Sequence, residues 1–254
     1  MKNFNIYAIV CIVILGLNCN NDNKPKKLKF TIIQEYPHDP QSFTQGLVWE
    51  NNVLYESIGL ENKSKLLKVD MITGQAYDTI HMDDHIFAEG ICVLDSFIYQ
   101  LTWQNHFVFV YRKSNFDLIK TFNIATEGWG ICSDGQNLWV SDGTNTLYYY
   151  NPNDLGLIKK IYVKNKNVMI SQLNELEYVD GFIYANQWNR NYIYKIDPID
   201  GKVVGILNLF DLKNRAATKY SNIDVLNGIA FNSDSKTFYI TGKFWPTLFE
   251  IKIE

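Results

Sequence analysis

Short runs of alternating apolar and polar residues recur along most of this chain, and turn residues separate them. Leu54-Tyr55-Glu56-Ser57 and Ile98-Tyr99-Gln100-Leu101 are two such runs, and Asn51-Asn52 and Asp95-Ser96 form the turns that precede them. Alternation with a period of two residues between turn signals is typical of β-strands joined in hairpins. The pattern therefore predicts an all-β protein.

The predicted hairpins belong to a longer repeat. Five segments align, and each opens with a polar or aromatic residue that leads into an apolar run; they begin at Gln45, Glu89, Trp129, Asn174 and Asn227. Successive segments are about 40 to 53 residues apart, which is the spacing of β-propeller blades. A second pair of strands follows each hairpin, so we expect four strands in each blade.

The last repeat holds only three predicted strands before the chain stops at Glu254. The alternating stretch from Leu28 to Glu35 can supply the fourth, which would close the ring and remove an exposed sheet edge. The sequence thus predicts a five-bladed β-propeller over residues 28–254, closed by its N-terminal strand. Segment 210–224 is longer than the other connections and is expected to carry a short helix.

Residues 1–18 have the features of a targeting segment and are excluded from the predicted fold. Lys2 precedes an apolar stretch from Ile6 to Leu17, which is shorter than a typical membrane span, and Cys19 follows. This resembles a bacterial lipoprotein signal in which Cys19 receives the lipid. An uncleaved anchor helix and an ordinary secretory signal are the alternatives.

The residues around Cys19 depart from the usual lipoprotein pattern, because Gly16 and Asn18 stand where Leu and a small residue are preferred. We nevertheless expect an exported protein at the cell envelope, lipid-anchored on the periplasmic or outer face. Residues 19–27 would then form a solvated tether, and the lipid would be the only link to the membrane.

Charge and cysteine content narrow the possible functions. The net charge is -3 and no dense Lys/Arg block is present, so no nucleic-acid partner is expected. Cys92 and Cys132 occupy equivalent positions in neighbouring repeats; we expect buried free thiols, with a disulfide as the alternative. Because the chain has no C-x-x-C pair and no His cluster, we expect no metal site and no cofactor.

The geometry of a propeller predicts where the equivalent positions of the repeats lie in space. In each blade the first strand lines the central channel and the second runs back antiparallel to it, so the start of one and the end of the other share one channel mouth. This rule brings together Gln45, Glu89, Trp103, Trp129, Asn174, Trp188 and Lys243, with Phe43 and Phe87 two residues before Gln45 and Glu89. A lone Trp is usually core, a lone Asn usually caps a turn and a lone Lys is usually solvated. Their predicted convergence indicates a functional site.

All five repeats contain longer motifs around these positions: Ser42-Phe43-Thr44-Gln45-Gly46-Leu47, Phe87-Ala88-Glu89-Gly90, Thr102-Trp103, Glu127-Gly128-Trp129-Gly130, Ser141-Asp142-Gly143-Thr144, Leu173-Asn174-Glu175-Leu176-Glu177, Asn186-Gln187-Trp188, Leu226-Asn227-Gly228-Ile229-Ala230 and Thr241-Gly242-Lys243-Phe244-Trp245-Pro246. Together these motifs resemble the glutamine cyclotransferase family of plants and bacteria, and the resemblance covers residues 30–254. It implies a five-bladed propeller that converts the N-terminal glutamine of peptides or proteins to pyroglutamate and releases ammonia, without a catalytic zinc.

The resemblance also implies roles for the residues at the channel mouth. Glu89 would carry a proton from the attacking amine to the leaving nitrogen, and Lys243, Asn174 and Gln45 would complete the catalytic set. The substrate-binding set would be aromatic: Phe43, Phe87, Trp103, Trp129 and Trp188. Aromatic surroundings raise the pKa of a carboxyl group and a nearby lysine lowers it, and the sequence leaves open which effect prevails at Glu89.

We expect the protein to be a monomer.

Two other classes of protein remain as alternatives. One is a non-catalytic propeller that binds a peptide or a glycan, because the fold alone does not specify activity. The other is a calcium-dependent propeller hydrolase, which would need several carboxylates around the channel. Glu89 is the only carboxylate at the start of a predicted first strand, and this argues against the second alternative.

Overall fold

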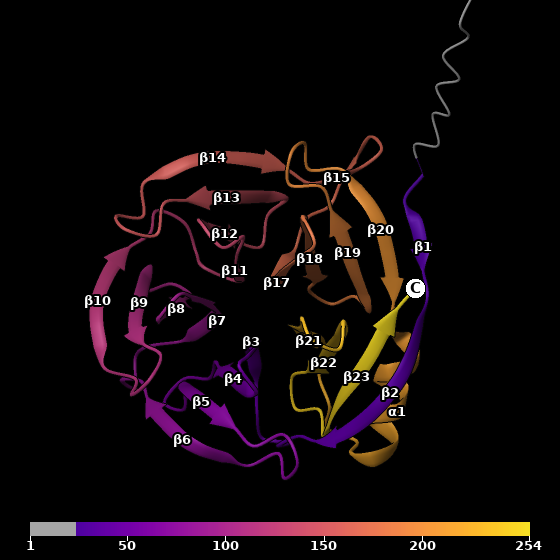
Figure 1. Cartoon of the computed structure of the whole chain (residues 1–254), viewed down its shortest axis with the longest axis horizontal. Coiled ribbons are helices and arrows are strands. Elements are labelled where there is room, and N and C mark those ends of the chain that lie inside the picture. Colours follow the sequence, from indigo (N-terminus) through magenta and orange to yellow (C-terminus); the bar gives the residue numbers. More distant parts are fainter. Residues whose placement is uncertain (1–23) are drawn as a thin grey trace, which may run out of the picture.

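The computed structural model describes residues 24–254, and these residues form five blades around a central channel (Figure 1). Each blade is an antiparallel sheet whose strands follow one another from the channel to the rim. The innermost strands are β3 (Thr44–Glu50), β7 (Ala88–Leu94), β11 (Ile131–Ser133), β17 (Leu173–Val179) and β21 (Leu226–Asn232). The arrangement confirms the predicted five-bladed β-propeller.

The remaining strands complete the blades in chain order. The second and third strands are β4 (Val53–Ile58) and β5 (Lys65–Val69), β8 (Phe97–Thr102) and β9 (Phe107–Arg112), β12 (Leu138–Ser141) and β13 (Thr146–Tyr150), β18 (Phe182–Gln187) and β19 (Tyr192–Ile196), and β22 (Thr237–Gly242) and β23 (Thr247–Ile253). The outer strands of the first four blades are β6 (Ala76–His81), β10 (Leu118–Asn123), β14 (Leu157–Tyr162) and β20 (Val203–Asn208).

The N-terminal strand closes the ring. Strand β2 (Phe30–Pro37) pairs antiparallel with β23, with Phe30 opposite Ile253, and so becomes the outer strand of the fifth blade. This confirms the predicted closure of the ring, and the last blade therefore has four strands. A short strand β1 (Lys26–Leu28) also pairs in parallel with β20, so sheet structure begins two residues before the expected boundary at residue 28. The expected targeting segment and Cys19 lie outside the described residues.

Two insertions lie at the rim of the propeller. The expected helix is α1 (Phe210–Lys219), which buries Leu212 and lies beside β2 and β23 (Figure 1). Arg215 and Lys219 of this helix pair with Glu35 of β2 at 3.0 and 2.7 Å. The second insertion, the hairpin β15 (Lys164–Asn165) and β16 (Val168–Met169), had no sequence prediction. Within residues 24–254, no helix is long and apolar enough to cross a membrane.

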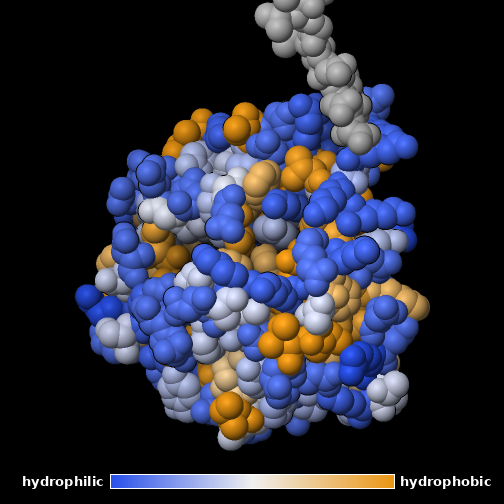
Figure 2. Space-filling view, turned by 45° about the vertical axis from the view of Figure 1, so that its right-hand side comes forward, coloured by the Kyte–Doolittle hydropathy of each residue, from blue (hydrophilic) through white to orange (hydrophobic). Residues whose placement is uncertain are grey.

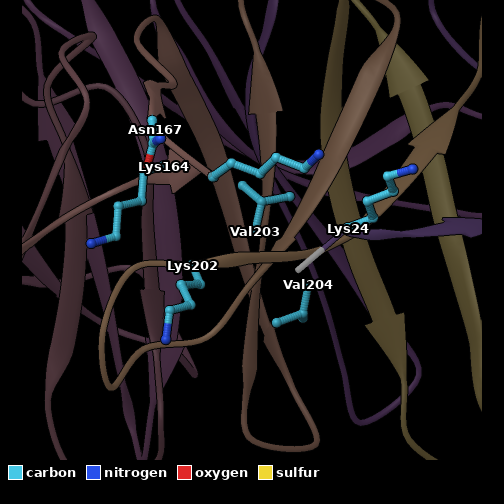
Figure 3. Close-up of a pocket in the computed structure, with 7 residues that line it drawn as sticks. Lys24, Lys164, Asn167, Lys202, Val203 and Val204 are labelled. Atoms are coloured by element: carbon cyan, nitrogen blue, oxygen red, sulfur yellow. The ribbon is translucent and has the colours of Figure 1, made fainter. Parts of the chain in front are cut away.

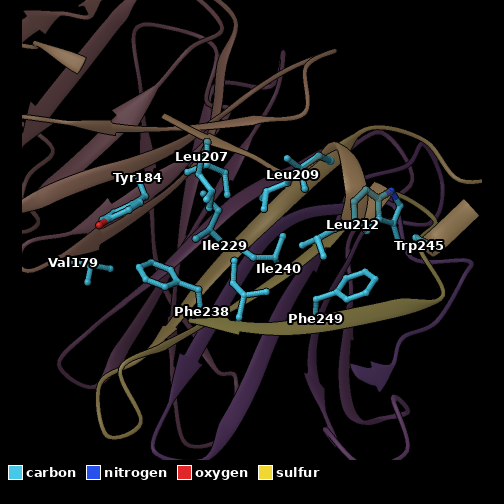
Figure 4. Close-up of a cluster of buried hydrophobic side chains, with 14 residues drawn as sticks. Val179, Tyr184, Leu207, Leu209, Leu212, Ile229, Phe238, Ile240, Trp245 and Phe249 are labelled. Carbon is cyan, nitrogen blue, oxygen red and sulfur yellow. The ribbon is translucent and has the colours of Figure 1, made fainter. Parts of the chain in front are cut away.

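Apolar side chains fill the spaces between neighbouring blades. Between the fourth and fifth blades, Tyr184 packs against Phe238 with ring centroids 5.0 Å apart, and Leu212 of α1 belongs to the same cluster (Figure 4). On the face seen in Figure 2, hydrophilic residues cover much of the surface and apolar residues form separate patches. Cys92 and Cys132 are buried free thiols, as expected.

In the first three repeats, the backbones of neighbouring innermost strands approach each other at the repeat glycine, which is Gly46, Gly90 or Gly130. A Cβ atom on Gly130 would lie 2.0 Å from the carbonyl oxygen of Asn174, and one on Gly90 would lie 2.8 Å from the Cα of Gly130. The fourth repeat has Glu175 instead of glycine. Its carboxyl group accepts the N–H of Ile229 at 2.9 Å and that of Leu47 at 3.4 Å, which joins the fourth blade to the fifth and the first. These contacts fix the backbone from which the channel-mouth side chains project.

Candidate active site

One end of the central channel opens into a hollow of about 340 Å³. Its lining consists of the nine residues that the sequence placed at the channel mouth: Phe43, Gln45, Phe87, Glu89, Trp103, Trp129, Asn174, Trp188 and Lys243. The structure therefore brings together every predicted catalytic and substrate-binding residue, although they come from all five blades. We call this hollow the channel-mouth pocket.

Strand ends account for this convergence. Gln45, Glu89 and Asn174 lie at the starts of β3, β7 and β17. Trp103, Trp188 and Lys243 directly follow the ends of β8, β18 and β22. Backbone hydrogen bonds hold these ends together: the N–H of Trp103 donates to the carbonyl of Phe87 at 3.0 Å, and the N–H of Lys243 donates to that of Val225 at 2.9 Å.

Aromatic rings form one wall of the pocket, which we call the aromatic arc and which consists of Phe43, Phe87, Trp103, Trp129 and Trp188. Phe244 packs against Phe43 but does not line the pocket. Ring centroids are 5.2 Å apart for Phe244 and Phe43, 6.3 Å for Phe43 and Phe87, and 5.7 Å for Phe87 and Trp103, all edge to face. Trp129 and Trp188 form a second edge-to-face pair at 6.1 Å. Edge-to-face contacts hold rings at fixed angles, so the arc is a preformed apolar wall.

The carboxyl group of Glu127 connects the two parts of the aromatic arc. Its Oε2 atom accepts the indole N–H of Trp103 at 2.8 Å and that of Trp129 at 3.0 Å. The sequence interpretation missed this role, because Glu127 lies in the loop before β11 and not at a strand end. The Glu127-Gly128-Trp129 motif was the available signal.

Glu89 is a buried carboxyl group that faces the pocket. It is 5% exposed, and within residues 24–254 its carboxyl oxygens have no hydrogen-bond partner. Burial raises the pKa of Glu89 well above its usual value; Lys243 opposes this shift and Glu127 adds to it. The question that the sequence left open is therefore answered in favour of a raised pKa, because loss of hydration outweighs the attraction of Lys243.

Lys243 supplies the cation of the pocket. Its Nζ atom lies 4.2 Å from the centroid of the Phe43 ring, and in the described part of the chain it forms no ion pair. Burial lowers the pKa of Lys243, while Glu89 and Asp224 act in the opposite direction. A weakly hydrated cation over an aromatic face interacts strongly with negative charge that develops nearby.

Two amide side chains complete the lining. The side-chain oxygen of Gln45 accepts a hydrogen bond from the side-chain nitrogen of Asn227 at 3.4 Å. The NH₂ group of Gln45 can therefore donate to a ligand in the pocket. The Asn174 side-chain oxygen is buried and has no partner in residues 24–254. Asn227 itself donates to the carbonyl of Thr44 at 2.9 Å and does not line the pocket. Its place in the repeat is therefore structural, whereas Gln45 and Asn174 can hydrogen-bond a ligand.

Other parts of the described chain lack this combination of groups. A hollow of about 540 Å³ at the rim is lined by Lys24, Lys164, Lys166 and Lys202, and it has no aromatic wall and no buried acid (Figure 3). No group of three or more His, Cys, Asp or Glu side chains in residues 24–254 is placed to hold a metal ion. The charged and amide side chains that line the channel-mouth pocket are those of Glu89, Lys243, Gln45 and Asn174.

Comparisons with known proteins agree with this geometry. The sequence model described as glutamine cyclotransferase matches residues 6–253. The chain belongs to the glutamine cyclotransferase family. A glutaminyl-peptide cyclotransferase of Arabidopsis thaliana is 38% identical to this family member over 226 residues, which are 88% of this chain and 71% of the plant protein.

A solved structure extends the similarity to the whole propeller. The crystal structure of Myxococcus xanthus glutaminyl cyclase matches with a TM-score of 0.86 and 34% identity, over 91% of this chain and 99% of that one. Hydrazine synthase of Kuenenia stuttgartiensis matches at a TM-score of 0.50 and 15% identity, over 80% of this chain and 56% of that one, which shows a shared fold alone. This glutamine cyclotransferase family member thus has the expected fold of its family.

Proposed function

We propose that this protein is a glutaminyl-peptide cyclotransferase, which converts the N-terminal glutamine of a peptide or protein to pyroglutamate and releases ammonia. The observation that carries the proposal is the channel-mouth pocket itself. It places one buried, unpartnered carboxyl group beside a lysine and two amides, against a preformed aromatic arc. Family membership and the names of the two similar proteins support the same reaction.

Ring closure requires the glutamine side chain to fold back on its own α-amine. The amine nitrogen attacks the γ-carbonyl carbon, a bond between them forms, and the bond from that carbon to the side-chain nitrogen breaks. Such an intramolecular step depends mainly on holding the reactive conformer, which can supply a large part of the rate enhancement. A rigid apolar wall of the size of the aromatic arc can exclude water and hold the folded-back side chain.

Glu89 moves the proton in this proposal. The attacking amine must lose one proton, and the side-chain nitrogen must gain one before it can leave as ammonia. A carboxyl group with a raised pKa is suited to both transfers, because its pKa lies closer to that of the reacting nitrogen and to the working pH. Glu89 takes the proton from the amine and returns it to the leaving nitrogen, so it is regenerated in each cycle.

Negative charge develops on the γ-carbonyl oxygen during the attack. Lys243, Gln45 and Asn174 line the same pocket, and their N–H groups are the donors that we assign to this oxygen. Donors that are already in place act strongly in a pocket from which water is excluded. We assign these three residues to stabilisation of the tetrahedral intermediate.

The finer classification follows from the same chemistry. The γ-acyl group of glutamine is transferred from ammonia to the α-amine, so the protein would be an acyltransferase. We also propose that it is a lipoprotein: residues 1–18 would be the signal peptide, and Cys19 would hold the protein at the cell envelope, on the periplasmic or outer face. The apolar stretch that ends before Cys19 supports this.

The proposal is tested by ammonia release from a peptide that begins with glutamine. The matched control is the same peptide with an acetylated amine, which has no nucleophile for ring closure. We expect turnover of the free peptide, pyroglutamate at its N-terminus by mass spectrometry, and no reaction of the acetylated peptide. Binding of the free peptide without turnover would instead indicate a non-catalytic propeller, and loss of activity with a chelator would indicate a metal-dependent enzyme.

A further inference from the structure

The aromatic arc has one break. Edge-to-face contacts connect Phe43, Phe87 and Trp103 on one side of it, and Trp129 to Trp188 on the other. In the described part of the chain no ring-to-ring contact joins Trp103 to Trp129. The side chain that bridges this break is Glu127, whose single Oε2 atom accepts both indole N–H groups.

The backbone around Glu127 is held on both sides. The carbonyl of Thr126 lies 2.8 Å from the Nδ1 atom of His106, and Gly128 packs so closely on Leu101 that a Cβ atom there would lie 2.9 Å from the Cβ of Leu101. The N–H of Trp129 donates to the carbonyl of Ser141 at 2.9 Å. The carboxyl group is therefore presented from a fixed loop between the second and third blades.

We propose that Glu127 is a positioning residue, whose carboxylate holds the Trp103 and Trp129 indoles at the angles at which they form the wall of the channel-mouth pocket. Hydrogen bonds from neutral donors to a charged acceptor are about twice as strong as those between neutral groups, and two of them on one oxygen fix two rings relative to each other. The inference rests on the proposed function, because the wall matters only if it holds a folded-back glutamine.

The charge of Glu127 has a second consequence for the pocket. It adds to the rise in the pKa of Glu89, whereas Lys243 opposes that rise, and these two are the charged groups that act on Glu89 in the described structure. Glu127 therefore combines orientation of the wall with an electrostatic effect on the proton carrier.

The first experiment does not depend on activity. Fluorotryptophan incorporated into the protein gives one fluorine NMR signal for each of its six tryptophans, and Trp103→Phe and Trp129→Phe assign two of them. In Glu127→Leu we expect these two signals to shift or broaden, and the Trp188 signal can follow because its ring contacts Trp129. The signals of Trp49, Trp139 and Trp245, which lie outside the aromatic arc, should stay in place. Glu61→Gln, at an exposed glutamate in a loop at the same end of the propeller, is the matched control and should move none. Unmoved Trp103 and Trp129 signals in Glu127→Leu would overturn the proposal.

The second experiment uses turnover of a glutamine-initiated peptide. Because a wall misplaced by about 1 Å can lower a rate by about 100-fold, we expect Glu127→Leu to lose about 10- to 100-fold in kcat/KM. In a Trp103→Phe/Trp129→Phe background the same substitution should cost much less, since the indole N–H groups are already gone. Equal losses in both backgrounds would show that Glu127 acts independently of the indoles.

Glu127→Gln separates orientation from charge. Glutamine keeps an oxygen acceptor for the indoles, so KM should remain close to the wild-type value, while the titration of the Glu89 carboxyl carbon in NMR should move to lower pH. An unchanged Glu89 titration would contradict the electrostatic part. If Glu127→Leu does not fold, the proposal is decided by the Glu89 titration in Glu127→Gln and by the fluorine NMR signals and turnover of Trp103→Phe and Trp129→Phe. A wild type without turnover would refute the proposed function, and the fluorine NMR would still test the indole contacts.

Discussion

Replacing Gly130 by alanine should lower both the stability of the propeller and the activity of its proposed active site. Gly130 lies on the innermost strand path of the third blade, and a Cβ atom there would sit 2.0 Å from the carbonyl oxygen of Asn174 and 2.8 Å from the Cα of Glu175. Both neighbours are backbone atoms of the fourth blade, so neither can rotate away. The two strands must therefore separate by about 1 Å or more to reach ordinary contact distances.

The size of the effect follows from that displacement. Overpacking of a closely packed interior typically costs about 1–3 kcal/mol, and a backbone neighbour places Gly130→Ala at the upper end of this range or above it. Because Asn174 moves with its carbonyl group, a shift of about 1 Å in a pocket that holds the reacting conformer should also lower kcat/KM by about 100-fold. Stability and activity should therefore fall together.

Urea unfolding followed by tryptophan fluorescence gives the first quantity, and ammonia release at a temperature where the variant is fully folded gives the second. Gly156→Ala is the control, because Gly156 is exposed and the nearest atom to its Cβ position is a carboxylate oxygen of Asp154 at 3.1 Å. We expect the control to stay within about 0.5 kcal/mol of the wild type with full activity. Wild-type stability and activity in Gly130→Ala would refute the reasoning that glycine is required there.

Two further predictions concern charged groups. Burial raises the pKa of Glu177 to about 8 from 4.5, so between these values the folded state binds more protons than the unfolded state and stability falls as pH rises. Glu177→Gln keeps an acceptor for the N–H of Phe231. By urea unfolding, the variant should be more stable than the wild type by about 1–3 kcal/mol near neutral pH and gain little at about pH 4.5. An equal gain in stability at both pH values would contradict this prediction. Lys243→Met keeps the apolar stem on Phe43 but removes the positive charge. The Glu89 carboxyl group should then titrate at higher pH in NMR, and kcat should fall by about 100- to 1,000-fold. An unchanged Glu89 titration would contradict the electrostatic contact between Lys243 and Glu89.

Positions fixed by the repeated backbone could be predicted from the sequence. Glu89 and Trp103 were placed at one mouth because a first strand must begin where the second one ends, and this holds in every blade whatever the side chains are. The same rule placed Lys243 once the longer hairpin of the fifth blade was counted. The closing strand was predictable because the last repeat lacked one strand and Leu28 to Glu35 alternated.

Features that depend on side-chain direction could not be predicted in this way. Glu127 lies in a loop, and nothing in the repeat indicates that its carboxyl group turns toward two indoles from different blades. The net shift of the pKa of Glu89 depends on how burial balances the charge of Lys243, which is a matter of distances. Strand β1 was also missed, because Lys26 and Lys27 carry no apolar alternation and pair only through their backbone.

The central claim is that Glu89 carries the proton between the attacking amine and the leaving ammonia. Its most direct test is the rate of ammonia release from a glutamine-initiated peptide by the wild type and by Glu89→Gln, with peptide binding measured in parallel. Since loss of a general acid–base group typically costs about 100- to 10,000-fold, we expect kcat to fall by that amount while the peptide still binds. A Glu89→Gln variant that releases ammonia at the wild-type rate would contradict the account.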